Sequence, residues 1–171
     1  AYGSDQHRHM MAMGSSAADT LTFNSDSNIT VTGRASNATT LTVNVGKNTA
    51  DLSDSNLTFV NMQTVSLSGA GTGATVLVNG FSGSANNMVL TMSGLEGGVS
   101  AASIVNNSGS VTISAEAMTG KLNTTTLQVT GAGNLIVSTG TSGQFSANTV
   151  DSTGTFTLDQ SANAAGSASL T

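Results

Sequence analysis

The sequence predicts an all-β protein, a parallel β-solenoid with coils of about 22 residues. Short runs in which Val, Leu, Ile or Phe alternates with Thr, Ser or Asn recur along the chain, and this two-residue period is typical of half-buried strands. The breaks between the runs are rich in Gly, Asn, Asp and Ser, which favour corners. The runs return at a nearly constant interval. A short unit that cannot bury its own apolar face becomes stable when successive copies stack, so the interval favours stacked coils.

Eleven short runs are the expected strands, whereas no long stretch of the chain has a helical pattern. The best helical candidate, Ala115 to Met118, is one turn at most. The expected strands are Leu21–Phe23, Ile29–Val31, Leu41–Val45, Leu57–Phe59, Val65–Leu67, Val76–Val78, Val89–Met92, Val111–Ile113, Leu127–Val129, Leu135–Val137 and Phe156–Leu158.

The spacing of the runs separates them into two series. The centres of the first series follow one another at a nearly constant interval and are Thr22, Val43, Ser66, Leu90, Thr112, Ile136 and Thr157. The second series lies between them at looser intervals, at Thr30, Thr58, Leu77, Ile104, Gln128 and Thr149. We therefore expect each coil to contribute two short parallel strands joined by Gly and Asn corners.

An antiparallel β-sandwich is the alternative fold, because its strands also recur at a short spacing, roughly 8 to 12 residues. A sandwich of hairpins usually carries tight two-residue turns of the Asn-Gly or Asp-Gly type. Asn79-Gly80 is the one such pair in the chain. The regular interval and the scarcity of hairpin turns both favour the solenoid.

Composition limits the classes of partner. Thr, Ser, Gly and Asn make up 87 of the 171 residues, whereas charged residues make up only 8%, and Cys and Pro are absent. With four basic residues and a net charge of −5, the chain has no basic surface for nucleic acid or anionic lipid. We expect no partner of either kind and no disulfide. We also expect no membrane span, since every apolar run is far shorter than such a span needs.

The ends of the chain differ from its middle. Residues 1–16 hold the only Tyr, both His and three of the seven Met, and we expect a flexible N-terminal arm or a remnant of an expression tag there. Residues 17–160 are the expected solenoid domain, and residues 161–171 form a tail of small residues.

Two sets of residues have the chemistry of a metal site. Asp51 and Asp54 lie three apart in a polar loop and have the oxygen ligands that Ca²⁺ takes, although solvated turn residues look the same in sequence. Asp5, His7 and His9 alternate along the arm, so on an extended segment they share one face and have the spacing to hold a divalent metal. Such a pattern in an arm is more often inert.

No enzyme is expected. Both His residues lie in the arm, so the folded body has no histidine for a Ser/His/Asp triad. A lyase or glycosidase on a solenoid needs paired carboxylates beside Lys or Arg. The basic residues Arg34, Lys47 and Lys121 are widely separated in sequence, and no cofactor motif is followed by a helix that would hold a phosphate.

Two segments of the sequence resemble those of a known protein family. VNMQTVSLSG at Val60–Gly69 and ISAEAMTG at Ile113–Gly120 resemble the coil-and-corner phrases of bacterial surface-layer (S-layer) proteins, of the Thr/Ser/Gly-rich, cysteine-free kind found in Caulobacter and Campylobacter. The chain departs from them at Gln63, where that family tends to have Glu, and at Ser114, where Asp is common. The resemblance implies an exported β-solenoid. The glycine-aspartate nonapeptides that bind calcium in that family are missing, since Gly69 to Leu77 contains no Asp.

The expected function is that of a secreted, extracellular structural protein that self-assembles into a surface layer or filament at the cell surface. Low charge leaves the open strand edges at the coil ends undefended against pairing with another copy. The expected contact regions are the N-terminal arm, the last strand at Phe156–Leu158 and the tail after it. The alternatives are an adhesin or phage-fibre module that binds a carbohydrate such as cell-surface polysaccharide, and a fragment of a longer surface protein.

Overall fold

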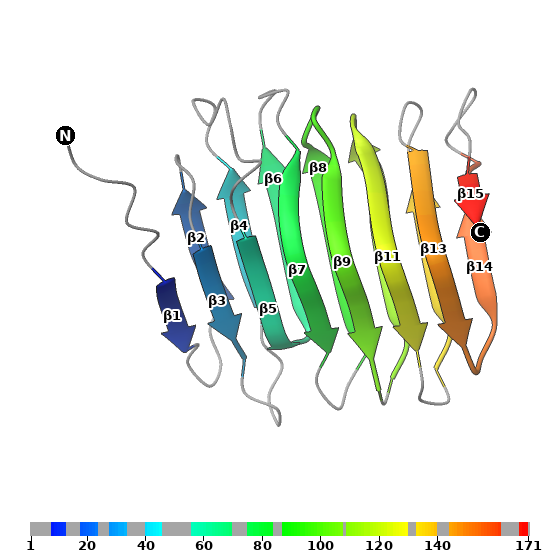
Figure 1. The fold of residues 1–171 in the computed structure, drawn as a ribbon, viewed down its shortest axis with the longest axis horizontal. Coiled ribbons are helices and arrows are strands. Elements are labelled where there is room, and N and C mark those ends of the chain that lie inside the picture. Colours follow the sequence, from blue (N-terminus) through cyan, green and yellow to red (C-terminus); the bar gives the residue numbers. More distant parts are fainter. Residues whose placement is uncertain are drawn as a thin grey trace.

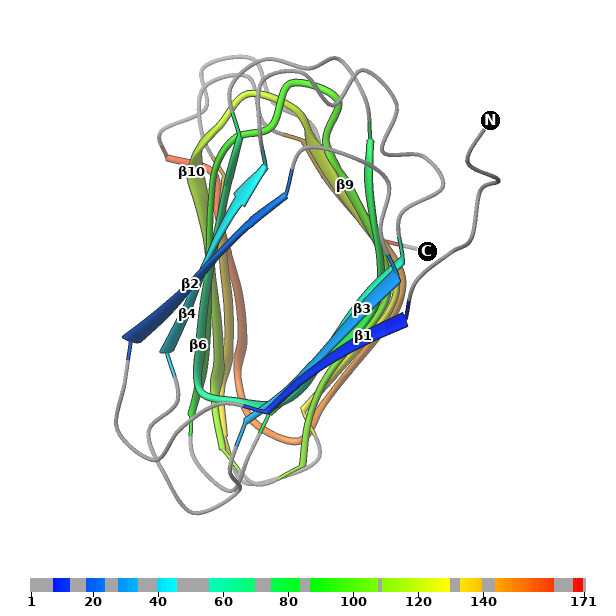
Figure 2. The same cartoon turned by 90° about the vertical axis from the view of Figure 1, so that its left-hand side faces the viewer.

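The computed structural model describes residues 8–12, 18–23, 28–33, 40–45, 56–69, 75–83, 87–107, 109–129, 133–139, 144–161 and 168–170. Their fifteen strands alternate between two sheets, as Figures 1 and 2 show. The eight-stranded sheet holds β1 (Arg8–Ala12), β3 (Asn28–Thr32), β5 (Asn56–Met62), β7 (Val76–Gly83), β9 (Val99–Asn106), β11 (Lys121–Val129), β13 (Gln144–Ser152) and β15 (Ala168–Leu170). The seven-stranded sheet holds β2 (Ala18–Phe23), β4 (Thr40–Val45), β6 (Thr64–Gly69), β8 (Met88–Gly94), β10 (Val111–Met118), β12 (Leu135–Thr139) and β14 (Phe156–Asp159).

Every pair of neighbouring strands is parallel and joins a strand to the next but one along the chain. The chain thus passes from one sheet to the other and back once per coil, which makes the fold a parallel β-solenoid. This confirms the predicted fold class. The antiparallel sandwich is wrong, because hairpin-connected strands would be antiparallel neighbours.

The coil length is about 23 residues, close to the expected value. In the eight-stranded sheet the register advances from Val76 to Val99, Leu122, Phe145 and Ala168, one coil length at every step. The two series of runs found in the sequence correspond to the two sheets: the regular series lies in the seven-stranded sheet and the looser series in the other.

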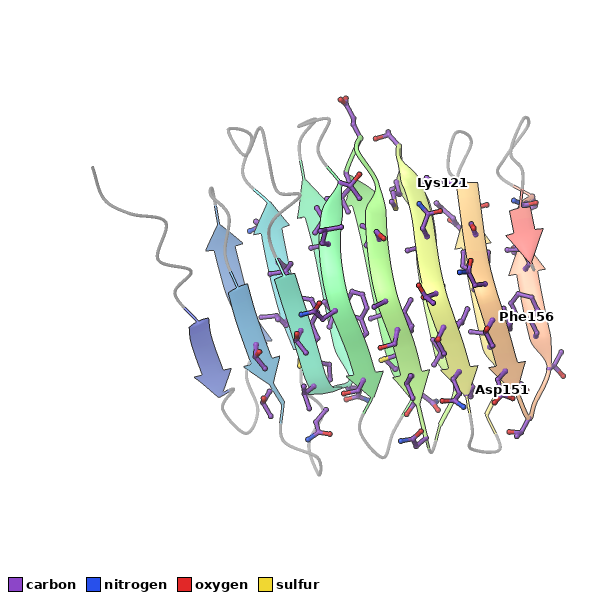
Figure 3. The ribbon with its side chains drawn as sticks, viewed as in Figure 1. Lys121, Asp151 and Phe156 are labelled. Carbon is purple, nitrogen blue, oxygen red and sulfur yellow. The ribbon has the colours of Figure 1, made fainter. Side chains whose placement is uncertain are left out.

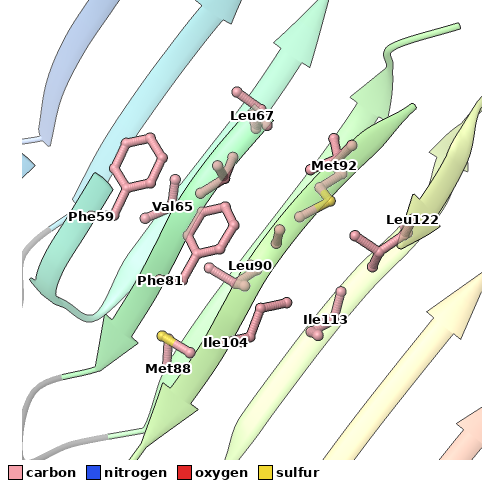
Figure 4. Packing of buried hydrophobic residues seen from close by; sticks show 14 of the residues in the cluster. Phe59, Val65, Leu67, Phe81, Met88, Leu90, Met92, Ile104, Ile113 and Leu122 are labelled. Atoms are coloured by element: carbon pink, nitrogen blue, oxygen red, sulfur yellow. The ribbon is translucent and has the colours of Figure 1, made fainter. Parts of the chain in front are cut away.

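The core lies between the sheets and is built from columns of apolar side chains. In-register pairing places the alternate residues of each strand above those of the next, so each inward position becomes a continuous column. One column of the seven-stranded sheet runs through Leu41, Val65, Leu90, Ile113 and Val137, none more than 1% exposed. In the opposite sheet Phe59 and Phe81 stack with ring centroids 5.0 Å apart and an interplanar angle of 11°. Figure 4 shows these two rings and their neighbours filling the interior.

Four strands of the eight-stranded sheet share a break in their alternation. In each, two consecutive residues in mid-strand face outward, and the inward pattern resumes after them. The pairs recur once per coil and are Asn79-Gly80, Ala102-Ser103, Thr125-Thr126 and Asn148-Thr149. Asn79-Gly80 is therefore part of a strand, not a hairpin turn. The extra outward residue bends every one of these strands at the same height.

The helical candidate Ala115 to Met118 is wrong, since these residues form the second half of β10. The register against β8 shifts between Ser114 and Ala117, so Glu116 and Ala117 both face outward while Met118 returns to the core. A bulge of this kind places buried residues three apart, which imitates the helical period in the sequence.

Strands extend into both terminal segments. β1 pairs with β3 through Arg8 and its neighbours, inside the segment expected to be a separate arm. β15 pairs with β13 inside the expected small-residue tail. The solenoid therefore continues beyond residues 17–160 at both ends.

Candidate functional site

The outer face of the seven-stranded sheet carries two columns of aligned side chains. From β4 to β14 the first column has a β-branched residue in each coil: Thr40, Thr64, Val89, Thr112, Ile136 and Thr157. The second column lies two residues along each strand and, from β4 to β12, has a hydroxyl in every coil before it ends in a carboxylate on β14: Thr42, Ser66, Thr91, Ser114, Ser138 and Asp159. The charged residue in these columns is therefore Asp159, on β14, the last strand of the sheet.

The hydroxyls of these two columns make no side-chain hydrogen bond to any other described residue, so they remain available to solvent. A side-chain bond between coils on this face joins Ser68 Oγ to Asn44 Oδ1 at 3.1 Å, in a third column beside the other two. Thr91 is exposed, and Ile136, at 38% exposed, is the single large hydrophobic residue on the surface of the described chain.

The outer face of the eight-stranded sheet is different, because several of its polar side chains form hydrogen bonds to the neighbouring coil. Asn79 Nδ2 donates to Thr58 Oγ1 at 3.4 Å, and Ser103 Oγ donates to the Asn79 carbonyl at 3.5 Å. Gln128 Nε2 donates to Asp151 Oδ2 at 3.1 Å. These bonds join β5 to β7, β7 to β9 and β11 to β13. Figure 3 shows Asp151 at the end of β13 and Lys121 at the start of β11.

A polar column also connects the corners that precede the strands of the seven-stranded sheet. Each side-chain oxygen accepts a backbone N–H from the following coil: Asn87 Oδ1 from Ser110 at 2.9 Å, Ser110 Oγ from Asn134 at 3.0 Å, and Asn134 Oδ1 from Thr155 at 3.1 Å. Backbone bonds cross the same corners in the other direction, for example from Met88 N to the Ser110 carbonyl at 2.8 Å. The corner is thus hydrogen-bonded in both directions, and the column ends at Thr155.

The last coil is less well covered than those before it. Phe156 and Leu158 of β14 pair with Leu135 and Val137 of β12, which are completely buried, yet they are themselves only partly buried. β14 is the outermost strand of its sheet. Beside it, the Ser161 backbone N–H donates to Asp159 Oδ1 at 2.9 Å, and this bond holds the pKa of that exposed carboxyl below its usual value.

The candidate metal ligands fall largely outside this region. Asp51, Asp54, Asp5 and His7 lie outside the described residues, and His9 is placed in β1 by its backbone alone. Among the described residues, no three His, Cys, Asp or Glu side chains are grouped as a metal would need. The calcium site at Asp51 and Asp54 stays a prediction.

Aromatic side chains face inward where the structure describes them. Phe59, Phe81 and Phe145 are 1% exposed, and Phe156 is partly buried against the core. Sugar-binding modules usually stack a pyranose ring on an exposed aromatic face. The described surface therefore offers the carbohydrate alternative little to use.

Comparison with family models, with curated proteins and with solved structures finds no match to this chain. In the part of the chain that the structure describes, no helix has the length and hydropathy needed to cross a membrane.

Sequence reasoning missed the corner column and the difference between the two outer faces. The signal for the corner column is visible in retrospect, because Asn87, Ser110, Asn134 and Thr155 precede strands and follow one another at about one coil length. Such residues are common in any turn, so their type alone does not reveal which backbone N–H they accept.

Proposed function

We propose that this protein is a secreted structural protein that self-assembles, coil end to coil end, into an extracellular filament or a surface layer. The proposal rests on the incomplete burial of apolar side chains in the last coil. Phe156 and Leu158 continue two core columns but have no further coil to cover them among the described residues. Covering such apolar area is favourable by about 25 cal/mol per Å².

The contact is head to tail. Because all strands are parallel, a second copy that places its first coil on β14 and β15 keeps the direction of every strand in both sheets. The exposed edge of β14 supplies backbone donors and acceptors, and the apolar columns supply the area. A contact of this kind uses two different surfaces and does not close on itself, so it generates a filament.

Composition and resemblance support the cell surface as the location. The chain lacks Cys, is poor in charge and is rich in Thr, Ser and Asn. Its phrases at Val60–Gly69 and Ile113–Gly120 resemble those of surface-layer proteins, which are exported and assemble outside the cell.

Electron microscopy of negatively stained protein, together with sedimentation velocity, tests the proposal. We expect filaments or sheets from the wild type and a shift toward monomers in Leu158→Lys, because a charge in the apolar column cannot be buried against a neighbouring coil. Thr157→Lys is the matched control, since it adds the same charge on the same strand but faces outward.

Phe156→Asp provides a second variant at the same end, and circular dichroism checks that each variant keeps its β-sheet content. A wild type that stays monomeric at all concentrations, with and without Ca²⁺, would overturn the proposal. So would Thr157→Lys disrupting the polymer as strongly as Leu158→Lys.

A further inference from the structure

The two columns on the outer face of the seven-stranded sheet form a regular two-dimensional array. Between coils the side chains repeat at about 4.8 Å, and along each strand they repeat every second residue, at about 6.6 Å. The array includes Thr64 and Ser66 of β6, Thr91 of β8, and Thr112 and Ser114 of β10. We call these columns, from β6 to β12, the hydroxyl face.

The hydroxyl face is nearly flat. Seen along the solenoid axis in Figure 2, β6 and β10 lie almost in line, whereas β2 and β4 cross them at an angle. Neighbouring strands of an ordinary open sheet are rotated by about 20° and would not keep a lattice in register. A flat sheet keeps both repeats constant over several coils.

The hydroxyl face has the chemistry to hold water in an ordered layer. A Ser or Thr hydroxyl can donate one hydrogen bond and accept two, and on this face no described protein group uses them. The adjacent column is β-branched in every coil, so methyl groups of Thr64, Val89 and Ile136 stand beside the hydroxyls. Apolar groups restrict the orientation of first-shell water, and the hydroxyls anchor it.

Charge would work against such a layer, because an ammonium or carboxylate orders water around itself. No charged side chain lies in either column between β6 and β12, and the first one is Asp159 on β14. The opposite sheet differs, since four of its strands carry an extra outward residue and some of its polar side chains bond across coils.

We propose that the hydroxyl face binds ice. The repeat between coils is close to the shorter oxygen repeat of the prism face of hexagonal ice, and the repeat along the strand is somewhat shorter than the longer one. Across only two columns this difference is small, so one layer of anchored water can belong both to the protein and to the crystal. Ice is the occupant because it is a flat, uncharged lattice of hydrogen-bonding groups. A protein partner or a sugar chain would need charge contrast or an aromatic platform, and the two columns have neither from β6 to β12. The outward carboxylate beside them is Glu116, past the bulge of β10.

Partitioning into slowly growing ice tests the proposal. Wild-type protein is expected to be enriched in the ice fraction and to inhibit ice recrystallisation. Thr91→Lys, in the middle of the hydroxyl face, should lower the enrichment by roughly tenfold, a loss of one order in the apparent affinity. Thr125→Lys is the matched control, because it changes another exposed Thr to the same residue on the bent sheet and should leave the enrichment unchanged.

Thermal unfolding of both variants checks that the fold is retained, and Ile136→Lys repeats the test at a second position of the hydroxyl face. The assay is also run on Leu158→Lys, so that ice binding is measured without end-to-end contact. Exclusion of the wild type from ice, as for an ordinary solute, would refute the proposal. An equal loss in Thr91→Lys and Thr125→Lys would refute it too.

Discussion

The two sheets of this solenoid are made by the same coils yet differ in shape and surface. Strands of the eight-stranded sheet carry an extra outward residue, bend, and bond their outer polar groups from coil to coil. Strands of the seven-stranded sheet run straight through the two outer columns from β6 to β12, and the hydroxyls of those columns have no protein partner among the described residues.

Within one coil, the outer face of one sheet therefore helps to hold the coils together, whereas the outer face of the other sheet is free to bind a partner. On the bent sheet, some outer side chains join neighbouring coils. On the flat sheet, the side chains of the hydroxyl face form no such bond to a described residue, so they contribute little to holding the coils together. Such a face can be selected for what it binds, whereas the bent face is constrained by its own hydrogen bonds.

Removal of core side chains should have the largest effect and be greater in the bent sheet. Phe81→Ala deletes a fully buried ring that stacks on Phe59, and we expect a loss of about 4 kcal/mol in the free energy of unfolding. Leu90→Ala, in the flat sheet, should cost about 3 kcal/mol. Urea denaturation followed by circular dichroism measures both. Equal or reversed losses would contradict the expectation that the stacked ring of Phe81 contributes more to stability than Leu90 does.

Glycine at the corner should be less replaceable than glycine in the bend. Gly94 has φ +66°, and a Cβ there would collide with the Gly69 carbonyl of the preceding coil, so Gly94→Ala should cost about 3 kcal/mol. Gly80 lies in the bend, where the one close contact of an added Cβ would be the movable Ser103 hydroxyl, at 2.8 Å, since the Ser103 carbonyl is at an ordinary 3.7 Å. Gly80→Ala should therefore cost less than about 1 kcal/mol, because the hydroxyl can rotate away. Thermal unfolding compares the pair, and similar losses would contradict the distinction.

The fold could be predicted from the sequence because stacking in register repeats the same inward positions. Leu41, Val65 and Leu90 recur at the coil length and alternate with polar residues, so periodicity alone reveals both the strands and their stacking. The bend could not be predicted, since Thr125-Thr126 looks like ordinary polar sequence until the buried residues on either side are known. The bulge at Ala115 to Met118 imitates a helical turn for the same reason.

The candidate site was predicted only in part. Phe156–Leu158 was expected as a contact region, because low charge leaves the edge of the last strand open to pairing, and Phe156 and Leu158 are only partly buried in the structure. The hydroxyl face was not expected. Thr and Ser are frequent everywhere in this chain, and only the register shows which of them share a column and which are already hydrogen-bonded.

Loss of a corner bond should have an intermediate effect. Asn134→Ala removes the acceptor of the Thr155 N–H, at 3.1 Å, and we expect a loss of about 1 kcal/mol. Asn79→Ala removes a longer, exposed bond to Thr58 on the bent sheet and should cost no more than about 0.5 kcal/mol. Hydrogen exchange at the Thr155 amide should rise in the first variant and stay unchanged in the second. An unchanged Thr155 amide in Asn134→Ala would contradict the corner bond.

The smallest expected effect is the most direct test of the difference between the two faces. Thr91→Val keeps the β-branched shape and removes a hydroxyl that bonds to no other described residue, so stability should change by less than about 0.3 kcal/mol. Thr58→Val makes the same change on the bent sheet, where the hydroxyl accepts from Asn79, and should cost about 0.5 kcal/mol because the amide loses its protein partner. Both are measured by urea denaturation at one pH and salt concentration. If Thr91→Val were the more damaging, its hydroxyl would have a structural bond, and the flat face would not be the free surface that ice binding requires.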